Sequence, residues 1–170
     1  VEFTLVNPKE SVFCHNIYLH AVNGAGGGAN VSNVNPGETK TFTFKALNPG
    51  TYIYHCAFSP PWLHVSNGMY GGIVVEPKGG LSKVDREFYV TQGDWYTSPS
   101  STKGHLDFNA EKAAAEHPDY ITFNGHTDAL TKIYMGTGIV PIRGDSSTPM
   151  YSEGTIYVAR AYGALPATFP

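Results

Sequence analysis

The sequence predicts an all-β protein that begins with a small Greek-key sandwich or barrel. Glycine and proline account for 19 and 12 of the 170 residues, and they divide the chain into short segments that suit strands better than helices. The clearest alternation lies in residues 41–46, where Phe42, Phe44 and Ala46 share one face and polar side chains share the other. This pattern is typical of a strand with one buried face.

The first 77 residues predict consecutive strands joined by turns. Segment 41–46 is preceded by Pro36-Gly37 and followed by Pro49-Gly50, and both are favourable turn dipeptides. A loop is expected at 58–70, before the last strand of this unit. The other strands expected here are 1–6, 14–21, 51–57 and 72–76.

A second unit is expected after a linker at 77–82, and it combines strands with one short helix. Asn109 is placed to cap a helix at 110–117, which Pro118 ends. Residues 131–153 have weak periodicity and predict no element. The strands expected in this unit are 84–91, 120–123 and 154–160.

The composition limits the kinds of partner. Charged residues make up 15% of the chain, the formal net charge is -3, and Lys and Arg form no cluster, so we expect no nucleic-acid partner. No apolar run reaches the roughly 18 residues of a membrane-spanning helix, so we expect no transmembrane segment. The glycine-rich segment 23–28 lacks the Lys-Ser/Thr of a phosphate-binding loop and predicts a flexible or close-packed loop.

Histidine and cysteine fall on both faces of two expected strands. Alternation places His15 with the apolar residues of 14–21, whereas His20 falls on the opposite, outward face with Asn16 and Tyr18. The neighbours His55 and Cys56 also point in opposite directions. Each strand therefore offers one ligand to each face.

One of these faces collects the ligands of a blue copper centre. Cys56, His64 and Met69 have the spacing C-x7-H-x4-M, and His15 arrives from an earlier strand. Two imidazoles, one thiolate and a weak thioether form the ligand set of such centres. The alternative is that these are ordinary core or loop residues. A disulfide between Cys14 and Cys56 would exclude the thiolate.

The opposite face holds the remaining pair, His20 and His55. Two imidazoles need a third ligand to make a catalytic metal site with an open position for substrate. Because His55 and Cys56 share a peptide bond, such a metal would be connected to the first by a few covalent bonds. The adjacent His and Cys thus predict electron transfer between two metals.

Five stretches in order resemble the copper-containing nitrite reductases, which are two-domain cupredoxin proteins. These stretches are 14–28, 35–57, 64–81, 85–97 and 118–131, so the resemblance covers about residues 1–131. It implies a cupredoxin-like domain at 1–80 that lacks its N-terminal strands, and part of a second such domain at 81–170. It also implies type 1 copper bound by His15, Cys56, His64 and Met69, and type 2 copper bound by His20 and His55.

The resemblance implies a reaction and its partners. Enzymes of this family reduce nitrite to nitric oxide, with electrons entering at type 1 copper and passing through Cys56 and His55 to type 2 copper. The electron donor is a small cupredoxin or a c-type cytochrome. The family's third type 2 histidine comes from a neighbouring subunit, which implies a homotrimer. A periplasmic location and a role in denitrification also follow from the resemblance.

Three departures from the family pattern are visible. Tyr18 stands where the family carries an aspartate that contacts substrate and delivers protons, and it is our candidate catalytic residue. A phenol, with an ordinary pKa of about 10, can donate a hydrogen bond but relays protons poorly at neutral pH. Cys14 replaces a usual proline and is expected to be a free, partly buried thiol. Beyond 131 the resemblance fades, and no histidine follows His126.

Two other functions are considered. The first is an electron-transfer cupredoxin with type 1 copper only, which the departure at Tyr18 and the unseen third histidine would favour. The second is a laccase-like multicopper oxidase, but the chain has no His-x-His pair and Ala57 follows Cys56. The remaining histidines are interpreted as surface or hydrogen-bonding residues: His105, His117 and His126.

Overall fold

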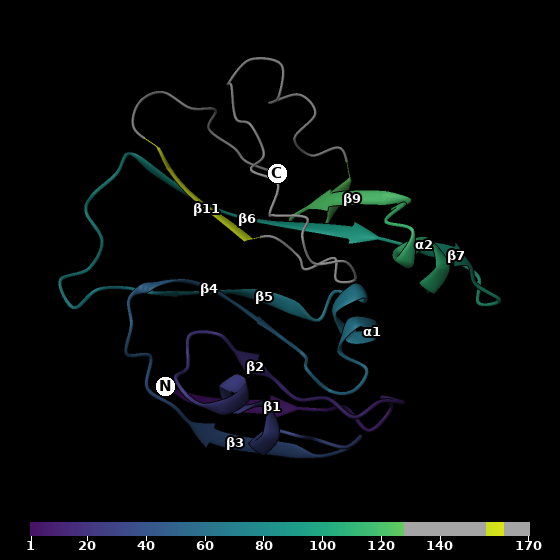
Figure 1. Cartoon of the computed structure of the whole chain (residues 1–170), viewed down its shortest axis with the longest axis horizontal. Coiled ribbons are helices and arrows are strands. Elements are labelled where there is room, and N and C mark those ends of the chain that lie inside the picture. The colour runs from purple at the N-terminus through teal and green to yellow at the C-terminus, as the bar shows by residue number, and fades with distance from the viewer. Residues whose placement is uncertain (128–155, 162–170) are drawn as a thin grey trace. The chain divides into compact units, whose positions relative to one another are not determined.

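The computed structural model describes residues 1–127 and 156–161, and most of its elements are strands (Figure 1). The chain divides into two compact units, Val1–Val84 and Asp85–Pro170. Among the described residues, no helix has both the length and the apolar character needed to cross a membrane. The two units are described separately.

The first unit contains two antiparallel sheets (Figure 1). One sheet pairs β1 with β3, and the other has the order β2-β4-β5. The core of the first unit includes Ile17, Leu19 and Ala21, so the apolar face predicted for these residues of segment 14–21 is confirmed. The strands are β1 (Glu2–Val6), β2 (Tyr18–Leu19), β3 (Thr39–Thr43), β4 (Gly50–His55) and β5 (Tyr70–Val75).

The strand expected at 14–21 is shorter in the structure. Only Tyr18 and Leu19 pair with β4, and His15 forms an isolated bridge with Val34. The ladder is interrupted because the buried side chain of Ser32 takes the place of a strand partner at Ile17. Its Oγ accepts the N–H of Ile17 at 3.1 Å and lies 3.2 Å from the Ile17 carbonyl oxygen.

The glycine-rich segment forms the 3-10 helix η1 (Ala25–Val31) and packs closely. Gly27 is buried, with a φ of 49°. A Cβ on Gly27 would lie 2.2 Å from Cδ2 of Tyr18 and 2.5 Å from the carbonyl oxygen of Leu19. Only glycine fits here, so the close-packed alternative expected from the sequence is confirmed.

A short helix, α1 (Pro61–Ser66), lies inside the segment that the sequence predicts as a loop. Pro61 occupies the first turn, where its missing N–H costs nothing and its φ suits a helix. The helix ends at Asn67 and Gly68, and Gly68 has a φ of 86°. Six residues are too few to show helical periodicity in a sequence, which is why the prediction was wrong here.

The second unit is built around the long strand β6, in a four-stranded sheet of order β10-β9-β6-β11. A separate hairpin pairs β7 with β8, and the helix α2 (Ala110–Ala114) follows it. The unpredicted segment 131–153 lies outside the described residues. The strands are β6 (Arg86–Trp95), β7 (Thr97–Pro99), β8 (Leu106–Phe108), β9 (Tyr120–Phe123), β10 (His126–Thr127) and β11 (Ile156–Ala161).

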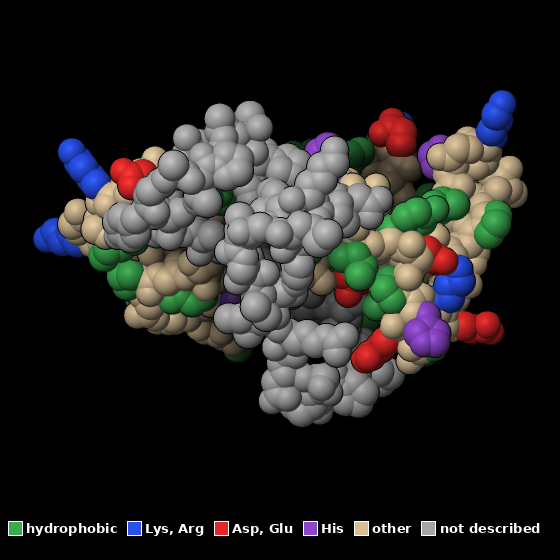
Figure 2. All heavy atoms as spheres, turned by 90° about the horizontal axis from the view of Figure 1, so that it is seen from above, with side chains coloured by type: hydrophobic (Ala, Val, Ile, Leu, Met, Phe, Trp, Pro, Cys, Tyr) green, Lys and Arg blue, Asp and Glu red, His purple; other side chains and the backbone are tan. Residues whose placement is uncertain are grey.

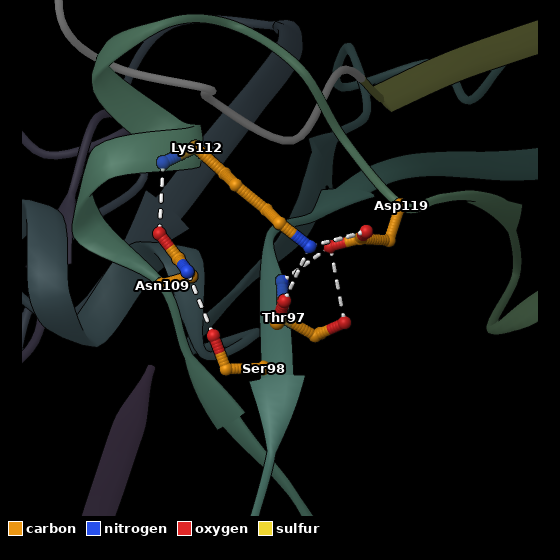
Figure 3. A network of polar contacts seen from close by, with 5 residues as sticks. All are labelled: Thr97, Ser98, Asn109, Lys112 and Asp119. Carbon is orange, nitrogen blue, oxygen red and sulfur yellow. Dashed lines mark hydrogen bonds and ion pairs between the residues drawn. The ribbon is translucent and has the colours of Figure 1, made fainter.

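The helix α2 is fixed to β7 by a polar network (Figure 3). Asn109 caps the helix as predicted, because its Oδ1 accepts the backbone N–H of Lys112 at 2.8 Å, and its Nδ2 donates to Ser98. Lys112 Nζ donates to Asp119 Oδ1 at 2.6 Å and to the Thr97 carbonyl at 2.7 Å. Asp119 Oδ2 accepts the backbone N–H of Thr97 at 2.7 Å. The network therefore joins the helix, the hairpin and the start of β9.

This network predicts the acid behaviour of Asp119. The hydrogen bonds from Lys112 and Thr97 lower the pKa of its carboxyl group below the ordinary value of 3.8. The unfolded chain then binds the proton more tightly, so the stabilisation is present above pH 3.8 and is lost as the pH falls through the folded-state pKa. An NMR titration of Asp119 should give a midpoint below 3.8, and Lys112→Met should raise it. A midpoint insensitive to Lys112→Met would contradict this account.

Acidic and basic side chains are interspersed over the described part of the surface seen in Figure 2. No basic patch gathers among the described residues on this face. This distribution agrees with the absence of Lys and Arg clusters in the sequence.

Candidate metal centre

Three of the predicted ligands meet in the first unit. The ligand atoms of His15, Cys56 and His64 all lie within 4.8 Å of one another. The two Nδ1 atoms are 3.2 Å apart, and Cys56 Sγ is 3.8 Å from Nδ1 of His15. Cys56 and His64 are 3% and 4% exposed. The structure thus forms a compact set of two imidazoles and one thiol, in which Cys56 and His64 are buried and His15 is half-buried.

The spacing of these atoms fits a bound metal ion. Imidazole nitrogen and thiolate sulfur bind a first-row ion such as zinc at about 2.0 and 2.3 Å, so two ligands of one ion lie about 3.2 to 3.8 Å apart. Nδ1 of His15 lies 3.2 Å from Nδ1 of His64 and 3.8 Å from Sγ of Cys56, and both separations agree with this range. Two imidazoles and a thiolate are also the trigonal set that suits copper in electron transfer.

Backbone hydrogen bonds bring the three ligands together from separate segments. His15 and Val34 exchange N–H···O bonds of 3.0 and 2.8 Å just before β2. Cys56, directly after β4, donates its N–H to the Met69 carbonyl at 2.9 Å. The N–H of Met69 donates to the carbonyl of His64, in α1, at 3.2 Å. The backbone of Met69 is therefore tied to two residues of the group, while its side chain is 36% exposed, so the axial thioether stays a prediction.

The electrostatic environment favours the metal-binding form of both imidazoles. Burial lowers the pKa of His15, and burial followed by the proximity of His15 lowers the pKa of His64. Both rings are therefore kept neutral at neutral pH, and a neutral imidazole nitrogen is the form that binds metal. Ser11 Oγ lies 3.4 Å from Nε2 of His15. With a metal on Nδ1, Nε2 would carry the proton and could donate a hydrogen bond to this hydroxyl.

Asn16 supports the site in a way that the sequence did not predict. We expected it on the outward face, but it is 8% exposed, so that prediction was wrong. Its Oδ1 accepts the N–H of Ala57 at 2.8 Å and lies 3.9 Å from Cys56 Sγ, while its Nδ2 donates to Asn33 at 2.9 Å. These hydrogen bonds make its burial favourable and hold the residue after Cys56. The only sequence signal for a supporting role of Asn16 was its position next to His15.

The other predicted pair also comes together. The Nε2 atoms of His20 and His55 are 3.1 Å apart, and their rings are solvent-accessible. His55 Nδ1 lies 3.0 Å from the Cys56 carbonyl oxygen. A carbonyl only accepts hydrogen bonds, so Nδ1 of His55 carries the proton and the lone pair of Nε2 faces His20. This is the tautomer that a metal at Nε2 requires.

Tyr18 packs against both histidines of this pair. Its ring stacks on His20 with a centroid distance of 4.4 Å and an interplanar angle of 25°. It contacts the ring of His55 at 5.3 Å and 66°. Tyr18 is also the strand partner of His55 in β2 and β4. The candidate catalytic residue therefore lies beside the pair, as its position in the sequence predicts.

The remaining histidines and Cys14 take no part in either cluster. His105, His117 and His126 are exposed, in agreement with their interpretation as surface residues. Both cysteines are free, so the disulfide alternative is excluded. The partly buried Cys14 donates its Sγ–H to Asn35 Oδ1 at 2.9 Å. The prediction of a free, partly buried thiol is thus confirmed.

Comparisons with known proteins agree on one family. The chain is 52% identical over 131 residues to the copper-containing nitrite reductase of Neisseria meningitidis serogroup B. It is 36% identical over 149 residues to that of Alcaligenes faecalis. These alignments cover 76% and 77% of this chain. The resemblance to the copper-containing nitrite reductases is thereby confirmed.

The similarity to nitrite reductases covers only part of those proteins. This chain spans 34% of the length of the Neisseria protein and 39% of that from Alcaligenes faecalis. A family model described as multicopper oxidase matches residues 25–79, which include His55, Cys56, His64 and Met69. That match begins after His15 and His20, and it covers the part of the first unit that carries the Cys-His-Met loop.

Solved structures confirm the cupredoxin-like fold. A copper nitrite reductase from Nitrosomonas europaea superposes with a TM-score of 0.61 and 36% identity, covering 74% of this chain and 41% of that chain. A crystal structure of a multicopper oxidase gives a TM-score of 0.53 and 26% identity, covering 73% and 39%. The all-β prediction is therefore correct.

Proposed function

We propose that this protein is a copper-dependent enzyme that reduces nitrite to nitric oxide. The proposal is carried by one observation: a first cluster (His15, Cys56 and His64) and a second cluster (His20 and His55) are joined by the His55–Cys56 peptide bond. The reaction consumes one electron and two protons for each nitrite, and it releases nitric oxide and water. Similarity to proteins named copper-containing nitrite reductase supports the same function.

The donor atoms suggest how copper would be divided between the clusters. We assign type 1 copper to His15, Cys56, His64 and Met69, and type 2 copper to His20 and His55. Bound copper would supply one-electron chemistry at the first cluster and an open position for an anion at the second. Cys56 and His64 of the first cluster are buried, whereas the second cluster is solvent-accessible, as a substrate site must be.

The chain itself offers a short electron path between the clusters. Cys56 contributes its thiol to the first cluster, and His55 contributes Nε2 to the second. Besides the peptide bond, the two residues share the contact between His55 Nδ1 and the Cys56 carbonyl at 3.0 Å. We propose that electrons cross through these bonds.

The wider family properties complete the proposal. A third type 2 ligand is expected from a neighbouring subunit of a homotrimer, because the pair of His20 and His55 needs one more donor. A small cupredoxin or a c-type cytochrome would deliver the electrons. The protein would then act in denitrification in the periplasm. Each of these properties rests on the family resemblance.

An electron-transfer protein with type 1 copper only is the second candidate. Among the described residues, the one group of three or more His, Cys, Asp or Glu side chains that could hold a metal is the first cluster. The second pair therefore depends on a donor from elsewhere. The substitution of the family's aspartate by Tyr18 favours the same alternative.

Electron paramagnetic resonance of the copper-loaded intact protein distinguishes the two candidates. The enzyme should show two Cu(II) signals, one of each type, and should release nitric oxide when nitrite and a reduced donor are added. His20→Ala should remove the type 2 signal and reduce nitric oxide formation to background, while the blue colour stays. A single type 1 signal with no nitric oxide would establish the electron-transfer protein instead.

A further inference from the structure

We propose that Tyr18 is a positioning residue, whose ring sets the orientation of the His20 imidazole and so keeps its Nε2 directed at Nε2 of His55. The consequence of this role for metal binding rests on the function proposed above. The role itself is a property of the metal-free protein. The Tyr18 ring occupies the position at which the copper-containing nitrite reductases carry an aspartate.

The first support is the contact between the two rings. The Tyr18 and His20 rings stack at a centroid distance of 4.4 Å and 25°. A parallel stack restricts the tilt of an imidazole and leaves its edge nitrogens available to ligands. The Nε2 atoms of His20 and His55 are already 3.1 Å apart in this arrangement. The stack therefore preorganises a two-nitrogen site at the solvent-accessible face.

The second support is that Tyr18 is itself held in place. The backbone of Gly27 lies so close to the ring that a Cβ there would come within 2.2 Å of Cδ2 and 2.3 Å of Cε2. The backbone of Tyr18 is paired with His55 in the sheet. The tyrosine is thus fixed by its strand and by η1. A fixed ring can transmit that order to a solvent-accessible neighbour, whereas a mobile one cannot.

The two imidazoles are held by different means. His55 is oriented by its own Nδ1 contact with the Cys56 carbonyl at 3.0 Å. His20 follows the short strand β2, and its backbone N–H donates to the Ile53 carbonyl at 3.1 Å. The His20 ring stacks face to face on the Tyr18 ring. The aromatic ring of Tyr18, and not its phenol hydroxyl, is therefore the group that orients His20. This distinction makes the proposal testable with conservative variants.

The test compares variants of the intact protein at position 18. Tyr18→Phe keeps the ring, whereas Tyr18→Leu removes it, and Tyr18→Ile is a second ring-free variant suited to a strand. Tyr52→Leu is the control, because Tyr52 is another half-buried tyrosine of the same sheet, three residues before His55. The ring protons of His20 are first followed by NMR without metal. Binding of copper is then measured by calorimetry and by electron paramagnetic resonance.

We expect Tyr18→Phe and the Tyr52→Leu control to keep the wild-type His20 shifts and the type 2 signal. The ring-free variants should lose the ring-current shift of His20 and bind the second copper about 10- to 100-fold more weakly. Their blue type 1 absorption should remain, which shows that they are folded. Wild-type shifts in the ring-free variants would overturn the proposal. Loss of the shift and of the signal in Tyr18→Phe would also overturn it, since the hydroxyl would then be the essential group.

These readouts separate the positioning role from the proposed function. If the wild-type protein binds a single copper, the nitrite reductase assignment fails. The metal-free NMR comparison still decides the positioning role in that case, because it depends only on the contact between Tyr18 and His20. If two coppers bind equally well to all variants, the positioning role fails while the proposed function stands.

Discussion

Replacing Cys56 with serine should abolish the blue colour of the copper-loaded protein, whereas Cys14→Ser should leave it unchanged. The intense visible absorption of a blue site requires a thiolate ligand, which serine cannot supply. Cys56 Sγ lies 3.8 Å from Nδ1 of His15, inside the first cluster. Cys14 precedes His15 in sequence, but its thiol is engaged with Asn35 at 2.9 Å. The two cysteines of the chain therefore form a matched pair for this experiment.

The visible spectrum and the copper content of both variants measure this prediction. Cys56→Ser should lose the thiolate band completely and should stop nitric oxide formation, because electrons no longer enter through the first cluster. Its second copper should still bind to His20 and His55. A Cys14→Ser protein that lost its colour while Cys56→Ser remained blue would show that the cluster seen here is not the metal site.

The ligands of this site could be predicted from the sequence because their geometry depends on local rules. Alternation at the end of β4 predicts that the neighbours His55 and Cys56 diverge, and the two side chains do join different groups of ligands. The spacing of Cys56, His64 and Met69 is a property of one loop. Neither inference required knowledge of distant contacts. The structure brings His15, Cys56 and His64 together, whereas the Met69 side chain is 36% exposed and its role as a ligand stays a prediction.

The supporting residues could not be predicted because they depend on packing between distant segments. Asn16 was expected at the surface, since strand alternation was applied beyond the two residues that pair in β2. Its partners Asn33 and Ala57 are far away in sequence. The helix α1, which carries His64, was missed for a related reason, because a six-residue helix owes its stability to its surroundings more than to its own sequence.

Replacing Gly27 with alanine should reduce the free energy of unfolding by roughly 2 to 5 kcal/mol. A left-handed backbone costs a non-glycine residue about 1 to 2 kcal/mol, and overpacking a close contact costs about 1 to 3 kcal/mol more. Gly27 meets both conditions, since its φ is 49° and a Cβ would lie 2.5 Å from the carbonyl oxygen of Leu19. The added Cβ would also lie 2.2 Å from Cδ2 of Tyr18, so the tyrosine ring would have to move. The Leu19 carbonyl belongs to the backbone and cannot yield easily.

Gly26→Ala is the matched control, because Gly26 has a similar φ of 64° but its nearest neighbour would be 3.8 Å from an added Cβ. The control should show the backbone cost alone, about 1 to 2 kcal/mol. Urea unfolding of both variants, followed by circular dichroism, measures the difference that the collision causes. Equal losses in the two variants would contradict the close packing of η1 on Tyr18. A larger loss in Gly27→Ala should be accompanied by weaker binding of the second copper, because the displaced ring no longer aligns His20.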